Sequence, residues 1–232
     1  MKKLIMIAAL AVPCVAVAEK NWHGEGDLAY SKSSGNSTNE SLFANLKLVY
    51  ERDRWTHTGQ IEAQNSSEDD ARSAEYYGAR AKSDFALNDT NYLFAGGRYL
   101  DDRFSGYEYQ ARVSTGVGAH IIATEVATFD LEGGVGYRRS KEQETGETLN
   151  EAVLIVASKY YRTITETTEF QSDFLAEAGQ DNTYLEAVVG VRVKINSRLG
   201  LKVGYTVKHN TDVPVDTKNT DTYTTVGLNY HF

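Results

Sequence analysis

Apolar and polar residues alternate with a period of two along most of this chain. In the segment 107–121, the odd-numbered residues are mostly apolar and the even-numbered residues are polar, charged or glycine. Successive side chains of a β-strand point to opposite faces, so the segment predicts a strand with one apolar and one polar face. Segments 127–140 and 199–210 repeat the pattern.

The same alternation recurs often enough to fill the chain with strands. The predicted strands are 22–32, 40–52, 55–65, 72–87, 91–101, 106–122, 127–140, 149–162, 166–179, 182–195, 199–210 and 221–232. The alternation is weakest in 149–162, where apolar residues run together at 153–156. An even number of strands is typical of single-chain bacterial outer-membrane barrels. We therefore predict an all-β fold, a transmembrane antiparallel up-and-down β-barrel of about 12 strands.

The predicted connectors differ in length on the two sides of the sheet. Short turns are expected at 53–54, 88–90, 123–125, 163–165 and 196–198. The connectors between them are mostly longer and polar, at 33–39, 66–71, 102–105, 141–148 and 211–220. The connector at 180–181 is the exception, because it is short. Outer-membrane barrels have short periplasmic turns and longer extracellular loops, so we expect both chain ends on the periplasmic side.

A soluble β-sandwich or lipocalin-like barrel would show a similar alternation, and two features argue against it. The set predicted to face inward is too charged for a dry core, because burying an unpaired charge is very costly. The apolar face places aromatic residues near strand ends, as the interfacial girdles of membrane barrels do. These aromatic residues are Tyr30, Tyr50, Trp55, Phe85, Tyr99, Tyr107, Phe129, Tyr137 and Tyr205.

The first 18 residues resemble a secretory signal peptide. Lys2 and Lys3 precede a mostly apolar run of about 14 residues, which ends in the small-x-small site 16–18. The run is too short for a membrane-spanning helix, which needs roughly 20 residues. A lipoprotein signal with lipidation at Cys14 is the alternative, and Pro13 before it fits poorly. We therefore predict a signal peptide at 1–18 and an outer-membrane β-barrel at 19–232, without disulfides because the chain has one cysteine.

Charge and motifs argue against catalysis and nucleic-acid binding. The formal net charge is −8 and becomes −10 once Lys2 and Lys3 leave with the signal peptide. The sequence shows no basic stripe, phosphate-binding loop, metal-ligand spacing or nucleophile motif. A lipid-cleaving barrel enzyme needs a serine and a histidine together on the lipid face, and His57 falls on that face without a neighbouring serine. A barrel protease needs acidic and histidine groups on the outer rim, of which His209 and Asp212 would supply one half. We therefore expect no enzyme activity, no cofactor, no metal and no nucleic-acid partner.

The predicted inward face carries charges of both signs in nearly equal number. The candidate lumen charge network is Glu25, Asp27, Lys47, Glu62, Arg80, Lys82, Arg98, Glu108, Arg112, Asp130, Glu132, Arg138, Glu169, Asp173, Glu186 and Arg192. Opposite charges paired across strands contribute roughly 0.2–1 kcal/mol each, which favours a structural network that largely occludes the lumen. The alternative is a narrow, weakly selective channel for ions or small solutes, since pore charges set selectivity.

The last predicted strand carries alternating apolar residues that count back from an aromatic: Leu228, Tyr230 and Phe232. Barrels delivered to the outer-membrane assembly machinery commonly end in this way, so these residues are predicted to form an assembly signal. The expected partners are outer-membrane lipid, the barrel assembly machinery, and ions or small solutes. We expect a monomer in the outer membrane of a Gram-negative bacterium.

Several short motifs carry a resemblance to a known family. They are the start at 22–30, the loop at 33–37, the strand 46–50 leading to Trp55, the segment 200–205, and 220–222 before the last strand. Through them the chain resembles the YdiY-like family of salt-induced outer membrane proteins, a domain family of unknown function. The resemblance implies an outer-membrane barrel with a role in envelope, salt or osmotic adaptation, and it supplies no catalytic residues. An outer-membrane hydrolase is the weakest alternative.

Overall fold

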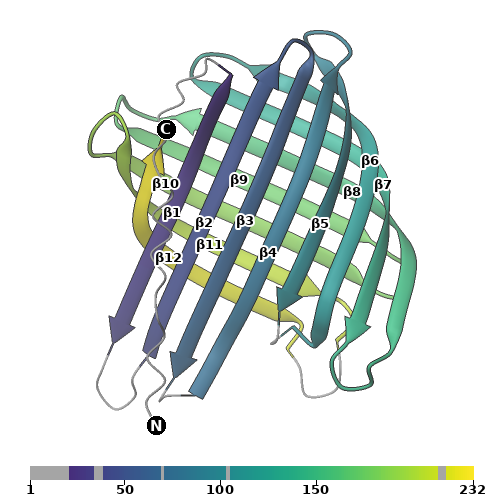
Figure 1. The fold of residues 1–232 in the computed structure, drawn as a ribbon. Coiled ribbons are helices and arrows are strands. Elements are labelled where there is room, and N and C mark those ends of the chain that lie inside the picture. The colour runs from purple at the N-terminus through teal and green to yellow at the C-terminus, as the bar shows by residue number, and fades with distance from the viewer. Residues whose placement is uncertain (1–20, 34–38, 69–70, 103–104, 214–217) are drawn as a thin grey trace.

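The computed structural model describes residues 21–33, 39–68, 71–102, 105–213 and 218–232, so the predicted signal peptide lies outside the described residues. In these ranges the chain forms twelve strands (Figure 1). They are β1 (Trp22–Ser33), β2 (Asn39–Arg52), β3 (Trp55–Glu68), β4 (Ala71–Ala86), β5 (Asn91–Asp102), β6 (Tyr107–Ala123), β7 (Ala127–Glu142), β8 (Thr148–Thr163), β9 (Thr168–Ala178), β10 (Thr183–Lys194), β11 (Leu199–Asn210) and β12 (Thr220–His231). Each predicted strand corresponds to one of these, with bounds that differ by three residues or fewer.

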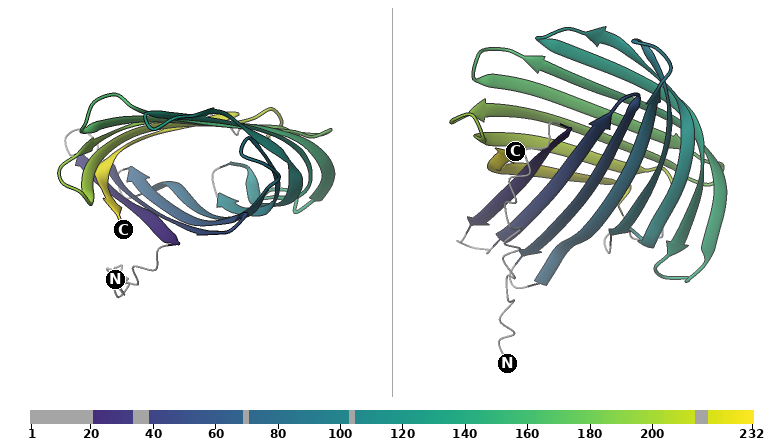
Figure 2. Two further views of the ribbon diagram at one scale, coloured as in Figure 1. Left: turned by 90° about the horizontal axis from the view of Figure 1, so that it is seen from above. Right: turned by 45° about the horizontal axis from the view of Figure 1, so that its top comes forward.

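The strands form one closed antiparallel barrel in which each strand pairs with its neighbours in the chain. The barrel closes where residues 25–29 of β1 pair with residues 227–231 of β12. Viewed end-on, the ring of strands is elongated rather than round (Figure 2). No helix in the described ranges is long and apolar enough to cross a bilayer. The topology confirms the predicted up-and-down β-barrel.

The exposure of side chains alternates along the strands, and the apolar side chains are the exposed ones. On β7, Val135 is 55% exposed, whereas Arg138 is fully buried. The same contrast separates the exposed Leu154 from the buried Glu151 on β8. Soluble proteins bury their apolar face, so this inverted arrangement fits a barrel whose outer face contacts lipid.

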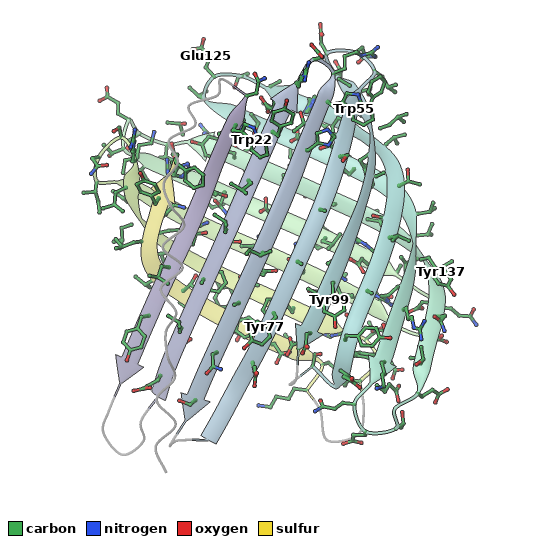
Figure 3. All side chains as sticks on the ribbon, in the orientation of Figure 1. Trp22, Trp55, Tyr77, Tyr99, Glu125 and Tyr137 are labelled. Atoms are coloured by element: carbon green, nitrogen blue, oxygen red, sulfur yellow. The ribbon has the colours of Figure 1, made fainter. Side chains whose placement is uncertain are left out.

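Aromatic side chains gather on the outer face at two levels. At the end where β1 begins, the rings of Trp22 and Tyr50 lie 4.7 Å apart, and those of Trp55 and Phe85 lie 4.9 Å apart. Figure 3 shows Trp22 and Trp55 near this end and Tyr99 toward the opposite end. Amphipathic rings favour the headgroup region, so the two levels mark the expected boundaries of the bilayer.

The two ends of the barrel differ modestly in the length of their connectors. At the turn end, where β1 begins and β12 finishes, the connectors between strands have two to four residues. At the opposite end, here the loop end, they have two to nine residues, and 211–219 is the longest. The contrast is weaker than predicted, because β3 and β4 continue toward each other and leave only 69–70 between them.

A β-bulge near the loop end corrects two predicted side-chain directions. The pairing of β6 with β7 shifts between Tyr107 and Tyr109, and an extra residue reverses the alternation beyond it. Tyr107 therefore lies buried rather than in the outer girdle, and its hydroxyl donates to the Asp212 carbonyl at 3.1 Å. Glu108 is exposed and pairs with Lys141 at 2.5 Å, so it does not lie in the lumen as predicted.

Candidate functional site

The interior of the barrel contains a cavity of about 500 Å³. Most of the residues predicted for a lumen charge network line it: Glu25, Asp27, Lys47, Glu62, Arg80, Lys82, Arg98, Arg112, Asp130, Glu132, Glu169, Asp173, Glu186 and Arg192. Arg138 is fully buried in the network beside the cavity, and Glu108 lies outside it because of the bulge. The structure therefore brings residues from many strands into one space.

Four arginines form a row across neighbouring strands, here called the arginine row. Arg80 of β4 is paired with Arg98 of β5, Arg98 with Arg112 of β6, and Arg112 with Arg138 of β7. Like charges directly opposite each other destabilise a sheet. The row therefore depends on carboxylates that reach it from other strands.

Glu177 of β9 is the main counter-charge of the arginine row. Its carboxylate accepts from Arg98 Nη2 at 2.7 Å and from Arg112 Nη1, and Arg138 Nη1 lies 3.6 Å away. Arg138 Nη2 also donates to Glu151 at 2.6 Å. Arg138 and Glu177 are both fully buried, so removing either would leave an uncompensated charge away from water.

On the loop-end side of the arginine row, large side chains pack against one another inside the barrel. Tyr76, Leu100 and Tyr184 are buried against one another. Lys208 covers the Tyr76 ring, with its Nζ 3.3 Å from the ring centroid. Beyond this layer lies a void of about 10 Å³, room for one water at most. These four residues are here called the seal.

Hydrogen bonds join the seal to the charged residues beside it. The Tyr184 hydroxyl donates to Glu186 at 2.5 Å, and the Tyr76 hydroxyl donates to Glu62. Arg80 Nη2 donates to both carboxylates, at 2.7 Å to Glu186 and 3.3 Å to Glu62. The seal and the arginine row thus form one connected network, in which moving a tyrosine also disturbs an ion pair.

Toward the turn end, the lumen is charged but more accessible to water. Asp27 accepts from Lys202 Nζ at 3.0 Å, and the Lys47 side chain is 39% exposed beside Glu25, 3.6 Å away. Lys159 is exposed, and no carboxylate of the described ranges lies within ion-pair distance of it. This part of the cavity, lined by Lys47, Lys159 and Lys202, is here called the chamber.

The neutral residues of the seal are not among the predicted lumen residues, all of which are charged. Tyr76 has the same parity as Arg80 on β4, and Tyr184 has the same parity as Glu186 on β10. Parity alone would therefore have placed both rings on the inward face. It would not have shown that they meet, because β4 and β10 are not neighbours in the sheet.

On the outer face, the His57 Nδ1 lies 2.8 Å from the Ser83 hydroxyl. No serine was expected near His57, and that expectation is wrong because the pairing of β3 with β4 sets the two residues opposite each other. The His57 ring also stacks on Trp55 at 5.7 Å. A catalytic histidine needs a carboxylate or amide that orients it, and no such group of the described ranges hydrogen-bonds to His57.

His209 gives no more support for catalysis than His57 does. His209 Nδ1 contacts the Thr220 hydroxyl at 2.8 Å rather than the side chain of Asp212. Among the described residues, no group of three or more His, Cys, Asp or Glu side chains could hold a metal ion. The lumen is accordingly the strongest candidate for a functional site.

A family described as "Protein of unknown function, DUF481" matches residues 26–232. The chain is also 30% identical over 218 residues to "Uncharacterized protein YdiY" of Escherichia coli (strain K12), covering 93% of this chain and 85% of that protein. Both matches extend over nearly the whole barrel, as the resemblance of the sequence motifs to the YdiY-like family indicated.

Two solved structures show the same architecture at low sequence identity. The NanC porin superposes with a TM-score of 0.52 and 10% identity, covering 89% of this chain and 96% of that one. The translocator domain of the autotransporter NalP from Neisseria meningitidis gives a TM-score of 0.50 and 13% identity, covering 91% and 88%. At this identity the likeness concerns the fold alone, and the fold is that of Gram-negative outer-membrane barrels.

Proposed function

The chain belongs to the DUF481 family, whose function is unknown, and we propose that it is an outer-membrane barrel with a closed lumen. Its proposed role is in envelope integrity or in salt and osmotic adaptation, rather than in free diffusion of solutes. The observation that supports closure is the seal, in which Tyr76, Leu100, Tyr184 and Lys208 pack across the lumen beside the arginine row.

The energetics of the network support closure. A solute that crossed the seal would have to displace the tyrosines and separate the carboxylates of Glu177 and Glu186 from their arginines. A hydrogen bond to a charged group contributes about 1.5–3 kcal/mol, and several are connected here. Thermal motion alone would therefore open the lumen only rarely.

The proposed link to salt starts from the resemblance to the YdiY-like family and gains support from a difference within the lumen. Salt screens exposed charges, with a Debye length of about 8 Å at 0.15 M. The pair of Lys47 with Glu25 is partly exposed, whereas the pair of Arg138 with Glu177 is fully buried. A rise in ionic strength would therefore weaken the pair of Lys47 with Glu25 in the chamber. It would leave the buried pair of Arg138 with Glu177 nearly unchanged.

Planar-bilayer conductance of the purified protein tests closure. We expect no steps from the parent protein and single-channel steps from a Tyr76→Ala, Tyr184→Ala double variant, because truncating both rings removes the buried layer. Tyr99→Ala is the matched control, since Tyr99 is 45% exposed on the outer face. Steady, large steps from the parent protein would refute closure.

A narrow channel for ions or small solutes is the second candidate, and the cavity of about 500 Å³ favours it. Both signs of charge line that cavity, so such a channel would select weakly between cations and anions. Small steps of weak selectivity from the parent protein, unchanged in the double tyrosine variant, would favour this candidate over a closed barrel.

An outer-membrane hydrolase has less support. The His57 and Ser83 pair is the best candidate for such a centre, and it lacks the third group that orients a catalytic histidine. Stacking of His57 on Trp55 fits a role in the aromatic girdle instead.

A further inference from the structure

The arginine row carries buried hydrogen-bond donors that the protein does not use. Nε of Arg80, Nε and Nη1 of Arg98, and Nε of Arg112 are buried and have no acceptor among the described residues. Buried polar groups in native structures are nearly always hydrogen-bonded, and a guanidinium has no way to lose its charge. The described part of the chain therefore offers these neighbouring donors no acceptor, and water or the oxygen of a solute can supply one.

The same three arginines line the cavity, and the side chains of Arg80 and Arg112 are 28% and 13% exposed, so a small solute in the chamber can contact these two. The cavity of about 500 Å³ lies in the range of roughly 300–1,000 Å³ that is usual for ligand pockets. Arg138, the fourth member of the row, does not line the cavity, and it is held by Glu151 and Glu177. The part of the row beside the cavity is thus Arg80 and Arg112, with the more buried Arg98 between them.

The carboxylates beside these arginines are already engaged. Glu177 accepts from Arg98 and Arg112, and Glu186 accepts from Arg80 and Tyr184. Each is therefore compensated by at least two donors and repels an incoming anion less than a free carboxylate would. The remaining donors are nitrogen atoms of cations, and the ligand group that matches them is an oxyanion.

The path to the row includes a lysine that lacks an ion-pair partner in the described ranges. The exposed Lys159 has no ion-pair partner among the described carboxylates, and Lys47 is partly exposed. Cationic side chains along a cleft raise the local concentration of anions. Lys159 therefore adds a positive charge that could attract an anion, in a chamber whose other charges, Asp173 among them, are of both signs.

We propose that Arg80, Arg98 and Arg112 form a binding site for the oxyanion group of a small acidic solute, a carboxylate, phosphate or sulfate, that enters from the chamber. The site needs the chamber and the row, and it does not depend on whether the seal conducts. It therefore goes beyond the proposed closure of the lumen and can fail or hold independently of it.

Isothermal titration calorimetry of the full chain, folded in detergent at low ionic strength, tests the site. The probes are sulfate, phosphate and gluconate, with glucose as the uncharged control and choline chloride to match ionic strength. We expect saturable binding of at least one oxyanion, weakened about tenfold or more in Arg98→Gln, because a charge-assisted donor is lost. Arg139→Gln is the matched control, since Arg139 is exposed on the outer face of β7, and it should bind like the parent protein.

Each outcome decides the proposal. Binding of sulfate or phosphate alone assigns the site to inorganic oxyanions, and tighter binding of gluconate assigns it to organic acids; both support it. Absence of saturable binding in a parent protein that is folded by gel mobility overturns it, as does equal binding of glucose or unchanged binding in Arg98→Gln. If Arg98→Gln does not fold, Arg112→Gln replaces it, and the oxyanion should also raise the temperature at which the parent's gel mobility changes.

Discussion

The two halves of the lumen use the same kinds of side chain and differ in their access to water. In the loop-end half, Arg138 and Glu177 are fully buried beneath the seal. In the turn-end half, the chamber leaves Lys47 partly exposed and Lys159 exposed. Both halves carry arginine or lysine opposite aspartate or glutamate, so composition does not separate them. The difference comes from the packing of Tyr76, Leu100, Tyr184 and Lys208, which excludes water from the ion pairs of the loop-end half.

This difference changes what an ion pair contributes. Breaking a buried pair by removing one partner typically costs 3–5 kcal/mol, because the other charge is left without water or a counter-charge. An exposed pair typically contributes about 0–1 kcal/mol, because water and salt already screen it. Substitutions of one type should therefore have unequal effects in the two halves.

The largest expected effect is the loss of the Glu177 carboxylate. Glu177→Gln should lower the free energy of unfolding by about 3–5 kcal/mol, since arginines of the row lose their shared counter-charge. Glu25→Gln in the chamber is the matched change, since Glu25 pairs with the partly exposed Lys47, and it should cost less than about 1 kcal/mol. Urea unfolding followed by gel mobility measures both. Equal losses in the two variants would show that the halves do not differ in the way described.

A smaller effect is expected where the barrel wall leaves no room for a side chain. A Cβ added at Gly134 would lie 2.5 Å from the Thr115 carbonyl oxygen and 2.8 Å from the Phe94 ring. Gly134→Ala should therefore destabilise the barrel by about 1–3 kcal/mol through overpacking. At the neighbouring Gly133, a Cβ would meet nothing within 4 Å, so Gly133→Ala should stay within about 0.5 kcal/mol of the parent protein.

The same unfolding assay checks the glycine pair. A large loss in Gly133→Ala, or none in Gly134→Ala, would contradict the packing described for β6 and β7. The pair also separates the two faces of one strand, because adjacent residues of a strand point to opposite sides.

Chemical modification of lysines compares the two halves of the lumen without a change in the sequence. A small water-soluble acylating reagent should modify Lys159 and Lys47 of the chamber well before Lys208 of the seal. Lys208 is buried, with its Nζ over the Tyr76 ring. Mass spectrometry of peptides from briefly treated folded protein gives the order of modification. Early modification of Lys208 would mean that water reaches the seal readily.

Alternation of residue types predicted the strands and most of the inward set. On β4, Arg80 and Lys82 were assigned to the lumen by parity, and both line the cavity. Parity failed at the start of β6, where the bulge buries Tyr107 and exposes Glu108. A bulge adds one residue to a strand without leaving a clear mark on the local pattern, so sequence could not locate it.

The sequence by itself determined the barrel, its two faces and its family, because the period of two is a local property of each strand and nearly every strand carries it. Only the tertiary structure decided which inward residues meet. The arginine row depends on the register of β4 to β7, Glu177 reaches it from β9, and Tyr184 of the seal comes from β10. The physical reason is that alternation fixes the direction of a side chain, whereas its depth and its neighbours depend on the pairing of strands and on the closure of the ring.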